Sequence, residues 1–140
     1  MATAKEVVLD VEDAWARGDL EALDQLVSPD LVSHDAIPGL PPGLTGARAG
    51  HSAFLHSFPD RTIAVEHVVA EGDLVAVHTR GEATHTGAPF FGIPPSGRPV
   101  TLESISIYRV RNGKVSEHWG LNATWALMQQ LGAIKPTGAG

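Results

Sequence analysis

The clearest structural signal in this chain is the sequence Ser106-Ile107-Tyr108-Arg109-Val110, followed by Asn112-Gly113 and Lys114-Val115-Ser116-Glu117-His118-Trp119. Asn-Gly between two runs rich in β-branched and aromatic residues is the strongest short signal for a β-hairpin, because Asn and Gly tolerate the positive φ angles of a tight turn. The pattern therefore predicts two paired antiparallel strands, over residues 100–111 and 114–122.

Residues 62–82 predict a second hairpin. The segments 62–70 and 74–82 contain alternating or β-branched residues and flank Glu71-Gly72-Asp73, a turn sequence. A Gly/Pro-rich connection, Phe91-Gly92-Ile93-Pro94-Pro95-Ser96-Gly97-Arg98-Pro99, joins this hairpin to the one downstream. Together the four segments predict an antiparallel sheet in the second half of the chain.

The first half of the chain predicts helices. Apolar residues recur at helical spacing over residues 3–17, at Val7, Val8, Val11, Ala14 and Trp15. Gly18 is expected to end this helix, and Asp19 to begin a second, short one that runs to about residue 27. A third helix is predicted over residues 45–57, after an irregular loop at 36–46 that holds three Pro and three Gly. Helices followed by antiparallel strands predict an α+β fold, with the helices on one face of the sheet.

Length and composition predict one small domain over residues 1–140, with a disordered tail at 135–140. No apolar run approaches the roughly 20 residues that span a bilayer, and the N-terminus lacks the apolar stretch of a secretory signal. The absence of cysteine excludes disulfides and thiolate chemistry and fits a cytoplasmic protein. A net charge of −6, with only ten Lys and Arg, argues against a nucleic-acid partner. We therefore expect a cytoplasmic protein with no membrane or nucleic-acid partner.

Several short motifs resemble those of a known family. They are Gly18-Asp19-Leu20-Glu21-Ala22-Leu23, His34-Asp35, Phe58-Pro59-Asp60, His85-Thr86-Gly87 and Glu117-His118-Trp119. Their layout, from about Val8 to Gly132, is similar to that of the SnoaL-like polyketide cyclases of the nuclear-transport-factor-2-like superfamily. The resemblance implies a strongly curved sheet that forms a cone around a long helix and leaves a mostly apolar pocket, the expected ligand site. It also implies a homodimer that pairs through the open sheet face, where outward Glu117, Trp119 and Ile105 or Ile107 would form an apolar patch.

His118 is the first candidate catalytic residue. Strand alternation puts His118, Gly120 and Asn122 on one face of the last strand, and Glu117, Trp119 and Leu121 on the other. An imidazole has an unperturbed pKa of about 6.5, so His118 could take a proton from an activated carbon while Asn122 donates to the enolate oxygen. The alternative is a strand histidine held by a cross-strand neighbour.

His34 and Asp35 form a second candidate acid/base pair, because a carboxylate beside an imidazole can orient it or raise its pKa. Alternatively, Asp35 makes an Asx turn into the loop that follows, and His34 packs under that loop.

His78 and Arg80 share one face of their strand and form a candidate binding pair, since a guanidinium would bind a carboxylate, phenolate or enolate oxygen. A salt bridge from Arg80 to Glu82 or Glu103 is the alternative. The other residues expected to contact the substrate are Trp119, Tyr108, Phe54 and His85, of which His85 could instead hold loop carbonyls in a structural role.

The seven histidines match no metal-binding motif, since neither His-Glu-x-x-His nor His-x-His occurs. We therefore expect no metal and no organic cofactor.

One feature departs from the family. Its cyclases are thought to use an aspartate near the last strand as acid/base, whereas Glu117 is the final carboxylate side chain here. Either His118 replaces that aspartate, or Asp35 or Glu103 reaches in, or the reaction is lost.

These residues predict a cofactor-independent enzyme that acts on a small, largely apolar carbonyl compound by acid/base enolate chemistry. An aldol-type polyketide cyclase is the reaction that the resemblance implies. The alternatives are an epoxide or ester hydrolase, or an isomerase, built on the same cone. A non-catalytic ligand-binding or dimerisation module is a further alternative, because one fold can host all of these functions.

Overall fold

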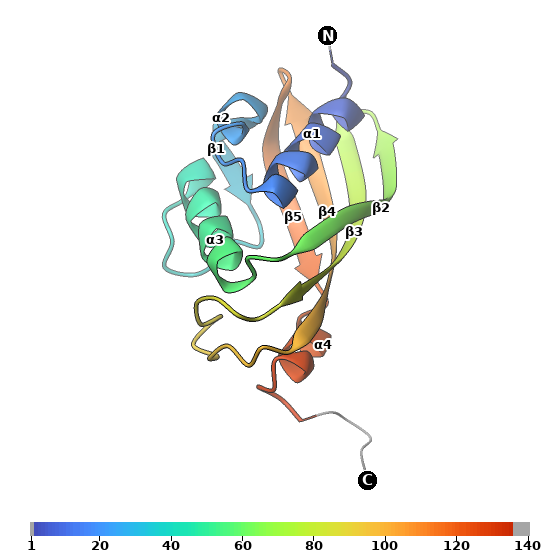
Figure 1. Cartoon of the computed structure of the whole chain (residues 1–140). Coiled ribbons are helices and arrows are strands. Elements are labelled where there is room, and N and C mark those ends of the chain that lie inside the picture. Colours follow the sequence, from blue (N-terminus) through green and yellow to red (C-terminus); the bar gives the residue numbers. More distant parts are fainter. Residues whose placement is uncertain (1, 136–140) are drawn as a thin grey trace.

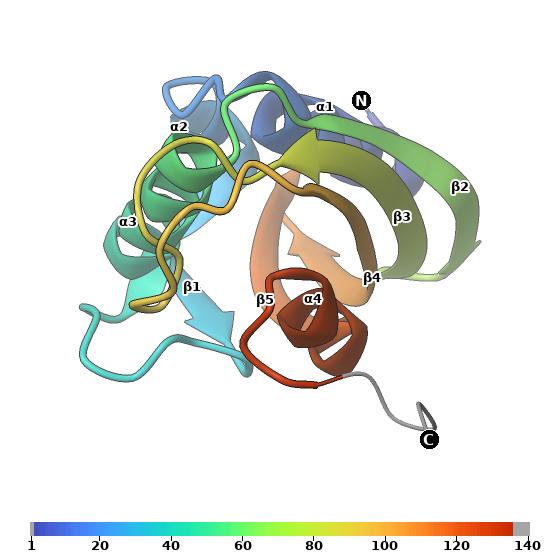
Figure 2. The same ribbon diagram turned by 60° about the horizontal axis from the view of Figure 1, so that its bottom comes forward.

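The computed structural model describes residues 2–135, which form four helices and five strands. The helices are α1 (Ala4–Arg17), α2 (Leu23–Leu26), α3 (Gly43–Ser57) and α4 (Thr124–Gln130). The strands are β1 (Val27–Ser33), β2 (Thr62–Glu71), β3 (Leu74–Thr84), β4 (Pro99–Arg111) and β5 (Lys114–Asn122). All five strands belong to one sheet, in the order β1-β5-β4-β3-β2. Figure 1 shows α1 lying across this sheet, and Figure 2 shows how strongly the strands curve.

The predicted α+β fold is confirmed, and both hairpins lie where the turn sequences put them. β2–β3, β3–β4 and β4–β5 pair antiparallel. Asn112 and Gly113 have φ angles of 54° and 77°, the left-handed geometry that an Asn-Gly turn requires. Gly18 likewise ends α1 with a φ of 74°. None of the described helices is long and apolar enough to cross a membrane.

β1 is not predicted by the sequence pattern. It pairs parallel to β5, with Val32 beside Glu117 and Ser33 beside His118, so the expectation of a wholly antiparallel sheet is wrong at this edge. Ser28-Pro29-Asp30 breaks the apolar pattern, yet an edge strand tolerates proline because one side of it needs no ladder hydrogen bonds. The strand register shifts between Val27 and Val32, at this same segment. The second helix, predicted from Asp19 to about residue 27, is shorter than expected. It spans only α2, and β1 begins at Val27.

Two clusters of buried residues attach the helices to the inner, helix-covered face of the sheet. Valines of α1 pack against β3, β4 and β5 in the larger cluster, whose members include Val8, Val11, Val75, Val77, Tyr108 and Val115. The smaller cluster contains Phe58, Ala83, Val100 and Leu131 near α4. α4 follows β5 and was not predicted. Five of the six residues in the tail expected to be disordered, 136–140, lie outside the described residues.

Candidate active site

Five polar side chains form a connected chain on the inner face of the sheet, and we call them the inner chain. They are Asp35, His118, Ser106, Tyr108 and Glu12. Oδ1 of Asp35 lies 2.9 Å from Nδ1 of His118, and Nε2 of His118 lies 3.1 Å from Oγ of Ser106. The hydroxyl of Tyr108 donates a hydrogen bond to Glu12 of α1. The Tyr108 and His118 rings also pack together, with their centroids 4.8 Å apart.

Strand register brings these residues together from β4 and β5. Tyr108 lies opposite His118, and Ser106 lies opposite Gly120. Because side chains alternate along a strand, the inner face of β5 carries His118, Gly120 and Asn122, as the sequence predicted. Asn122 lies opposite Ser104 and is exposed.

Asp35 reaches the inner face from the end of β1. The backbone N–H of His34 donates to the carbonyl of His118 at 2.9 Å, which ties the two strands together directly before Asp35. A Cβ atom on residue 120 would lie 2.6 Å from Oδ2 of Asp35 and 2.8 Å from Cε1 of His118. The Asp35 carboxylate therefore occupies space that exists only because residue 120 is glycine.

Asp35 is held as a carboxylate. Burial raises its pKa, but hydrogen bonds from His118 and Ser33 and the positive charge of protonated His118 outweigh this effect, so the pKa lies below its ordinary value. The Asp35 side chain is 33% exposed and that of His118 is 20% exposed, so a ligand can reach both. Among the described residues, both ring nitrogens of His118 and Oδ1 of Asp35 have hydrogen-bond partners. Oδ2 of Asp35 is the atom of the pair left to meet a substrate.

Glu12 and Ser106 are members of the inner chain that sequence reasoning missed. Glu12 follows Val8 by one helical step of four residues, so it lies beside the stripe that α1 turns toward the sheet. A carboxylate at this place in an apolar stripe is the signal that could have identified it. Burial raises the pKa of Glu12 more than its hydrogen bond from Tyr108 and the charge of His118 lower it.

His34 points to the opposite, outer face of the sheet, so the structure does not bring His34 and Asp35 together as a pair. The two residues follow the end of β1 directly, and their side chains contact residues on opposite faces of β5. Nε2 of His34 lies 2.7 Å from Glu117, and the His34 ring stacks on Trp119 with centroids 4.7 Å apart. Glu117 is also bound by Arg109 at 3.1 Å.

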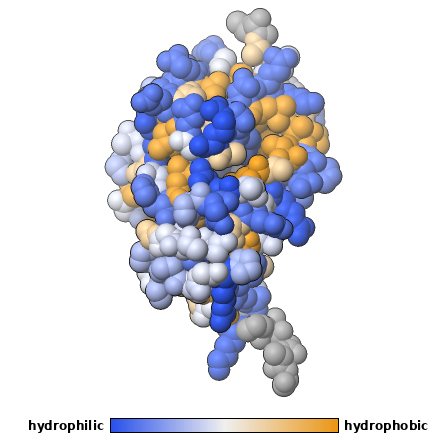
Figure 3. Space-filling model, viewed as in Figure 1, coloured by the Kyte–Doolittle hydropathy of each residue, from blue (hydrophilic) through white to orange (hydrophobic). Residues whose placement is uncertain are grey.

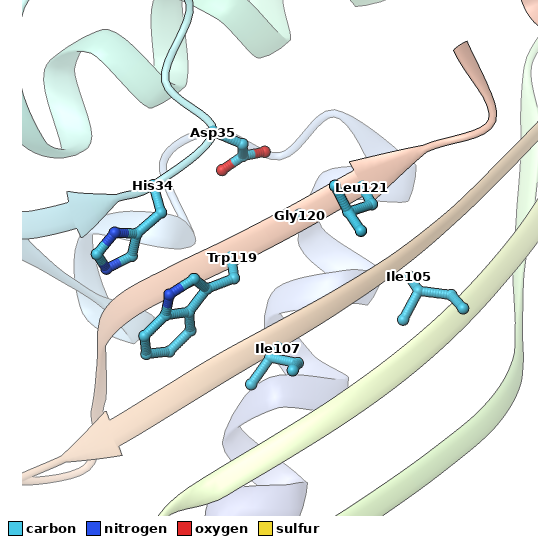
Figure 4. Close-up of a pocket in the computed structure, with 7 residues that line it drawn as sticks. All are labelled: His34, Asp35, Ile105, Ile107, Trp119, Gly120 and Leu121. Atoms are coloured by element: carbon cyan, nitrogen blue, oxygen red, sulfur yellow. The ribbon is translucent and has the colours of Figure 1, made fainter. Parts of the chain in front are cut away.

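The outer face carries an apolar patch, which we call the outer patch. It consists of Ile105, Ile107, Trp119 and Leu121. With His34 beside it, the outer patch lines a groove of about 290 Å³, which also touches Asp35 and Gly120 at its edge (Figure 4). Leu121 is 79% exposed and Ile105 57%. The α1 side of the molecule, seen in Figure 3, is mostly hydrophilic, with hydrophobic residues gathered over β2.

His78 and Arg80, the predicted binding pair, lie on the outer face of the sheet, and Trp119 lies on that face too, as strand alternation predicted. Their strand neighbours Val77 and Thr79 are buried on the inner face, and alternation turns His78 and Arg80 away. Nε2 of His78 lies 3.1 Å from Glu103, and Arg80 lies 4.0 Å from the same carboxylate. Of the two carboxylates considered as replacements for the missing aspartate, Asp35 reaches the inner face and Glu103 does not.

Phe54 and His85 lie in the apolar packing near Phe58. Phe54 packs on Phe58 with ring centroids 5.2 Å apart. His85 is fully buried, and its Nε2 donates to the carbonyl of Ala88 at 2.9 Å, which agrees with the structural alternative. Tyr108 is on the inner face but only 5% exposed, so it contacts His118 and Glu12 rather than solvent.

Within residues 2–135, no group of three His, Asp or Glu side chains is placed to hold a metal ion.

Comparisons with known proteins agree with this fold. The family model described as SnoaL-like polyketide cyclase matches residues 5–131. IdmH from Streptomyces antibioticus, a candidate polyketide cyclase, is 34% identical, with a TM-score of 0.80 over 94% of this chain and 99% of IdmH. AclR from Streptomyces galilaeus, a candidate hydroxylase, is 30% identical, with a TM-score of 0.82 over 97% of this chain and 85% of AclR. TsrD from Streptomyces laurentii is 26% identical, with a TM-score of 0.81 over 91% of this chain and 96% of TsrD. No curated protein sequence matches the chain significantly.

Proposed function

The chain belongs to the SnoaL-like polyketide cyclase family, and we propose that it closes a ring in a small, largely apolar carbonyl compound by a cofactor-independent, aldol-type reaction. The observation that carries the proposal is the carboxylate of Asp35, which lies over Gly120 and 2.9 Å from His118. Asp35, two residues after β1, supplies the aspartate that is absent near the last strand.

The Asp35–His118 pair is the acid/base unit of this proposal. Proton removal from a carbon beside a carbonyl needs a base that is ionised near neutrality, and the lowered pKa of Asp35 meets this condition. Oδ2 of Asp35 accepts the proton, while Nδ1 of His118 holds Oδ1 in place. The C–H bond breaks as an O–H bond forms, and the electron pair of the C–H bond becomes the enolate.

Asn122 is the proposed donor to the enolate oxygen. It lies on the same inner face of β5, two residues beyond Gly120, which corresponds to about 7 Å along a strand. The enolate carbon then attacks a second carbonyl carbon of the same molecule, and the oxygen of that carbonyl takes the proton back from Asp35. The cycle consumes no oxidant, reductant or water, so the product is an isomer of the substrate.

Mass spectrometry of the product tests this reaction. Purified protein is incubated with linear compounds that carry two carbonyl groups, and ring closure leaves the mass unchanged or lowers it by one water after dehydration. His118→Gln should slow formation of the product by roughly 10²–10⁴, while the matched outer-face change His78→Gln should leave the rate unchanged. A product heavier by one water would indicate hydrolysis and contradict the proposal.

We also propose that two copies of this chain pair through the outer patch. Leu121 and Ile105 are exposed on an open sheet face. In a two-fold dimer this apolar face would pack against the same face of the second copy, so both copies would bury it. Charged groups flank the patch, with Arg109 bound to Glu117 on one side and His78 bound to Glu103 on the other. This border leaves the centre of the patch free of charge, as in other protein interfaces.

A further inference from the structure

The inner chain continues beyond His118 to Glu12, a carboxylate that the proposed steps do not use. Nε2 of His118 contacts Ser106, and Tyr108 donates to Oε1 of Glu12. Ser106 and Tyr108 lie two residues apart on the same face of β4, and interaction with the Ser106 hydroxyl acts to lower the pKa of the Tyr108 phenol. Each of the two hydroxyl groups can donate one hydrogen bond and accept another. The contacts therefore form a continuous path between the imidazole and the Glu12 carboxylate.

Two arrangements of the protons satisfy this path. In the first, protonated His118 donates from Nε2 to Ser106, Ser106 donates to Tyr108, and Tyr108 donates to ionised Glu12. In the second, every donor is reversed, so that Glu12 is protonated and neutral Nε2 accepts from Ser106. Nδ1–H of His118 donates to Asp35 in both arrangements. Three proton transfers connect them, and at each one an N–H or O–H bond breaks as a new one forms.

We propose that Glu12 and His118 share one proton through Ser106 and Tyr108, and that this proton switches Asp35 between base and acid. The role as a switch rests on the proposed function. With the proton on Glu12, His118 is neutral and Asp35 is the stronger base, which favours removal of the substrate proton. With the proton on His118, its positive charge makes protonated Asp35 the stronger acid, which favours return of the proton to the new alkoxide. Glu12 is thus a positioning residue that acts through other side chains.

The electrostatics of the buried groups agree with this geometry. Burial raises the pKa of Glu12 above its ordinary value, so placing a proton on this carboxylate costs less free energy than it would on an exposed glutamate. Burial also raises the pKa of Tyr108 well above its ordinary value, so the phenol passes the proton on without ionising. The titratable groups that act on Glu12 are Tyr108 of β4 and His118 of β5. α2, β2 and β3 contribute apolar residues to the packing of α1, namely Leu23, Val68, Val75 and Val77.

The ring ¹⁵N signals of His118, followed by NMR across a pH titration without substrate, test the shared proton. Glu12→Gln keeps the side-chain shape and removes the negative charge, so the midpoint of the His118 titration should fall by about one pH unit. Tyr108→Phe keeps the carboxylate and interrupts the path, and the midpoint should fall here too. Asp10→Asn removes an exposed carboxylate from the same helix and should leave the midpoint unchanged. An unchanged midpoint in Glu12→Gln, or in Tyr108→Phe alone, would overturn the proposal.

Turnover tests the switch separately. Glu12→Gln and Tyr108→Phe should each lower the rate of ring closure by roughly tenfold and change its dependence on pH. The double variant should be no slower than the slower single variant, because both changes interrupt one path. Additive losses, or wild-type rates in Glu12→Gln, would contradict the switch. If His118→Gln leaves ring closure intact, the proposed function fails, while the NMR titration still decides whether the proton is shared.

Discussion

Two histidine–carboxylate pairs lie on opposite faces of the same sheet, at nearly the same place along β5. On the inner face, His118 contacts Asp35 at 2.9 Å, and on the outer face His34 contacts Glu117 at 2.7 Å. The outer carboxylate is also bound by Arg109, and the outer imidazole stacks on Trp119. In the inner pair, Asp35 makes its hydrogen bonds to Ser33 and His118 through Oδ1 alone. The two pairs therefore have similar distances but different further partners, which is why we propose a catalytic role for the inner pair alone.

The largest expected difference between the two faces concerns turnover. His118→Gln should lower the turnover number by roughly 10²–10⁴, the usual contribution of a general acid/base, because glutamine fills the volume but cannot take up and release a proton near neutral pH. His34→Gln is the matched change on the outer face and should alter turnover by less than about threefold. Steady-state kinetics on both variants measure the contrast. A comparable loss in both would remove the distinction between the faces, and a large loss of thermal stability in His118→Gln with intact turnover would assign His118 a structural role.

A second prediction concerns the space above Gly120. Gly120→Ala puts a methyl group 2.6 Å from Oδ2 of Asp35 and 2.8 Å from Cε1 of His118, so the two side chains must shift from their present geometry. Turnover should fall by roughly 10², since small displacements of catalytic groups have effects of this size. In the Asp35→Asn background the same change should lower turnover little further, because the group that it displaces has already lost its function. Equal losses in both backgrounds would show that Gly120 serves another purpose.

The outer patch should control association. Leu121→Glu introduces a charge at a site that is 79% exposed in the single chain, so the fold tolerates it. Burial of this unpaired charge in a dimer should weaken association by about 3 kcal/mol, or roughly 10² in Kd. Ala53→Glu adds the same charge on the exposed side of α3 and should have no effect. Light scattering across a micromolar concentration series measures the change, and a wild-type chain that stays monomeric there would contradict the proposed dimer.

The smallest expected effect concerns His51, on the helix-covered side. Burial lowers its pKa to about 4, although Nε2 contacts the carbonyl of Trp15 at 2.8 Å. The unfolded chain binds a proton at this histidine near pH 6.5 and the folded chain does not, so the stabilisation is present above pH 6.5 and is lost as pH falls toward 4. Between pH 7 and pH 5 the loss should be about 2 kcal/mol. Urea unfolding at both pH values should show a smaller difference in His51→Gln than in wild type, and equal differences would contradict the prediction.

Strand alternation predicted the two faces of β5 from the sequence. Once the Asn112-Gly113 turn fixes the hairpin, the order of His118, Trp119, Gly120 and Leu121 determines which side chains share a face. The same rule correctly groups His78 with Arg80 on one face of β3. It does not show whether that face is the inner or the outer one. Two-residue alternation relates side chains to each other, and only packing against α1 distinguishes inside from outside.

The position of Asp35 could not be predicted in this way, because it depends on a parallel pairing between β1 and β5. Residues far apart in sequence form that pairing. Pro29 and its polar neighbours also interrupt the apolar pattern from which a strand would be predicted. Without β1, His34 and Asp35 look like one pair, since they are adjacent in sequence. Glu12 escaped notice for a related reason. A charged residue on an amphipathic helix normally faces solvent, and only its contact with Tyr108 shows that this one does not.

The claim that Asp35 removes a proton from carbon is tested most directly by hydrogen–deuterium exchange in a substrate analogue. A ketone that lacks the second carbonyl cannot close a ring, but it can lose and regain the proton beside its carbonyl group. In deuterated water, wild-type protein and the outer-face variant Glu117→Gln should both incorporate deuterium at that carbon, and Asp35→Asn should incorporate it at least roughly 10² more slowly. Exchange by Asp35→Asn at the wild-type rate would contradict the role assigned to the inner pair.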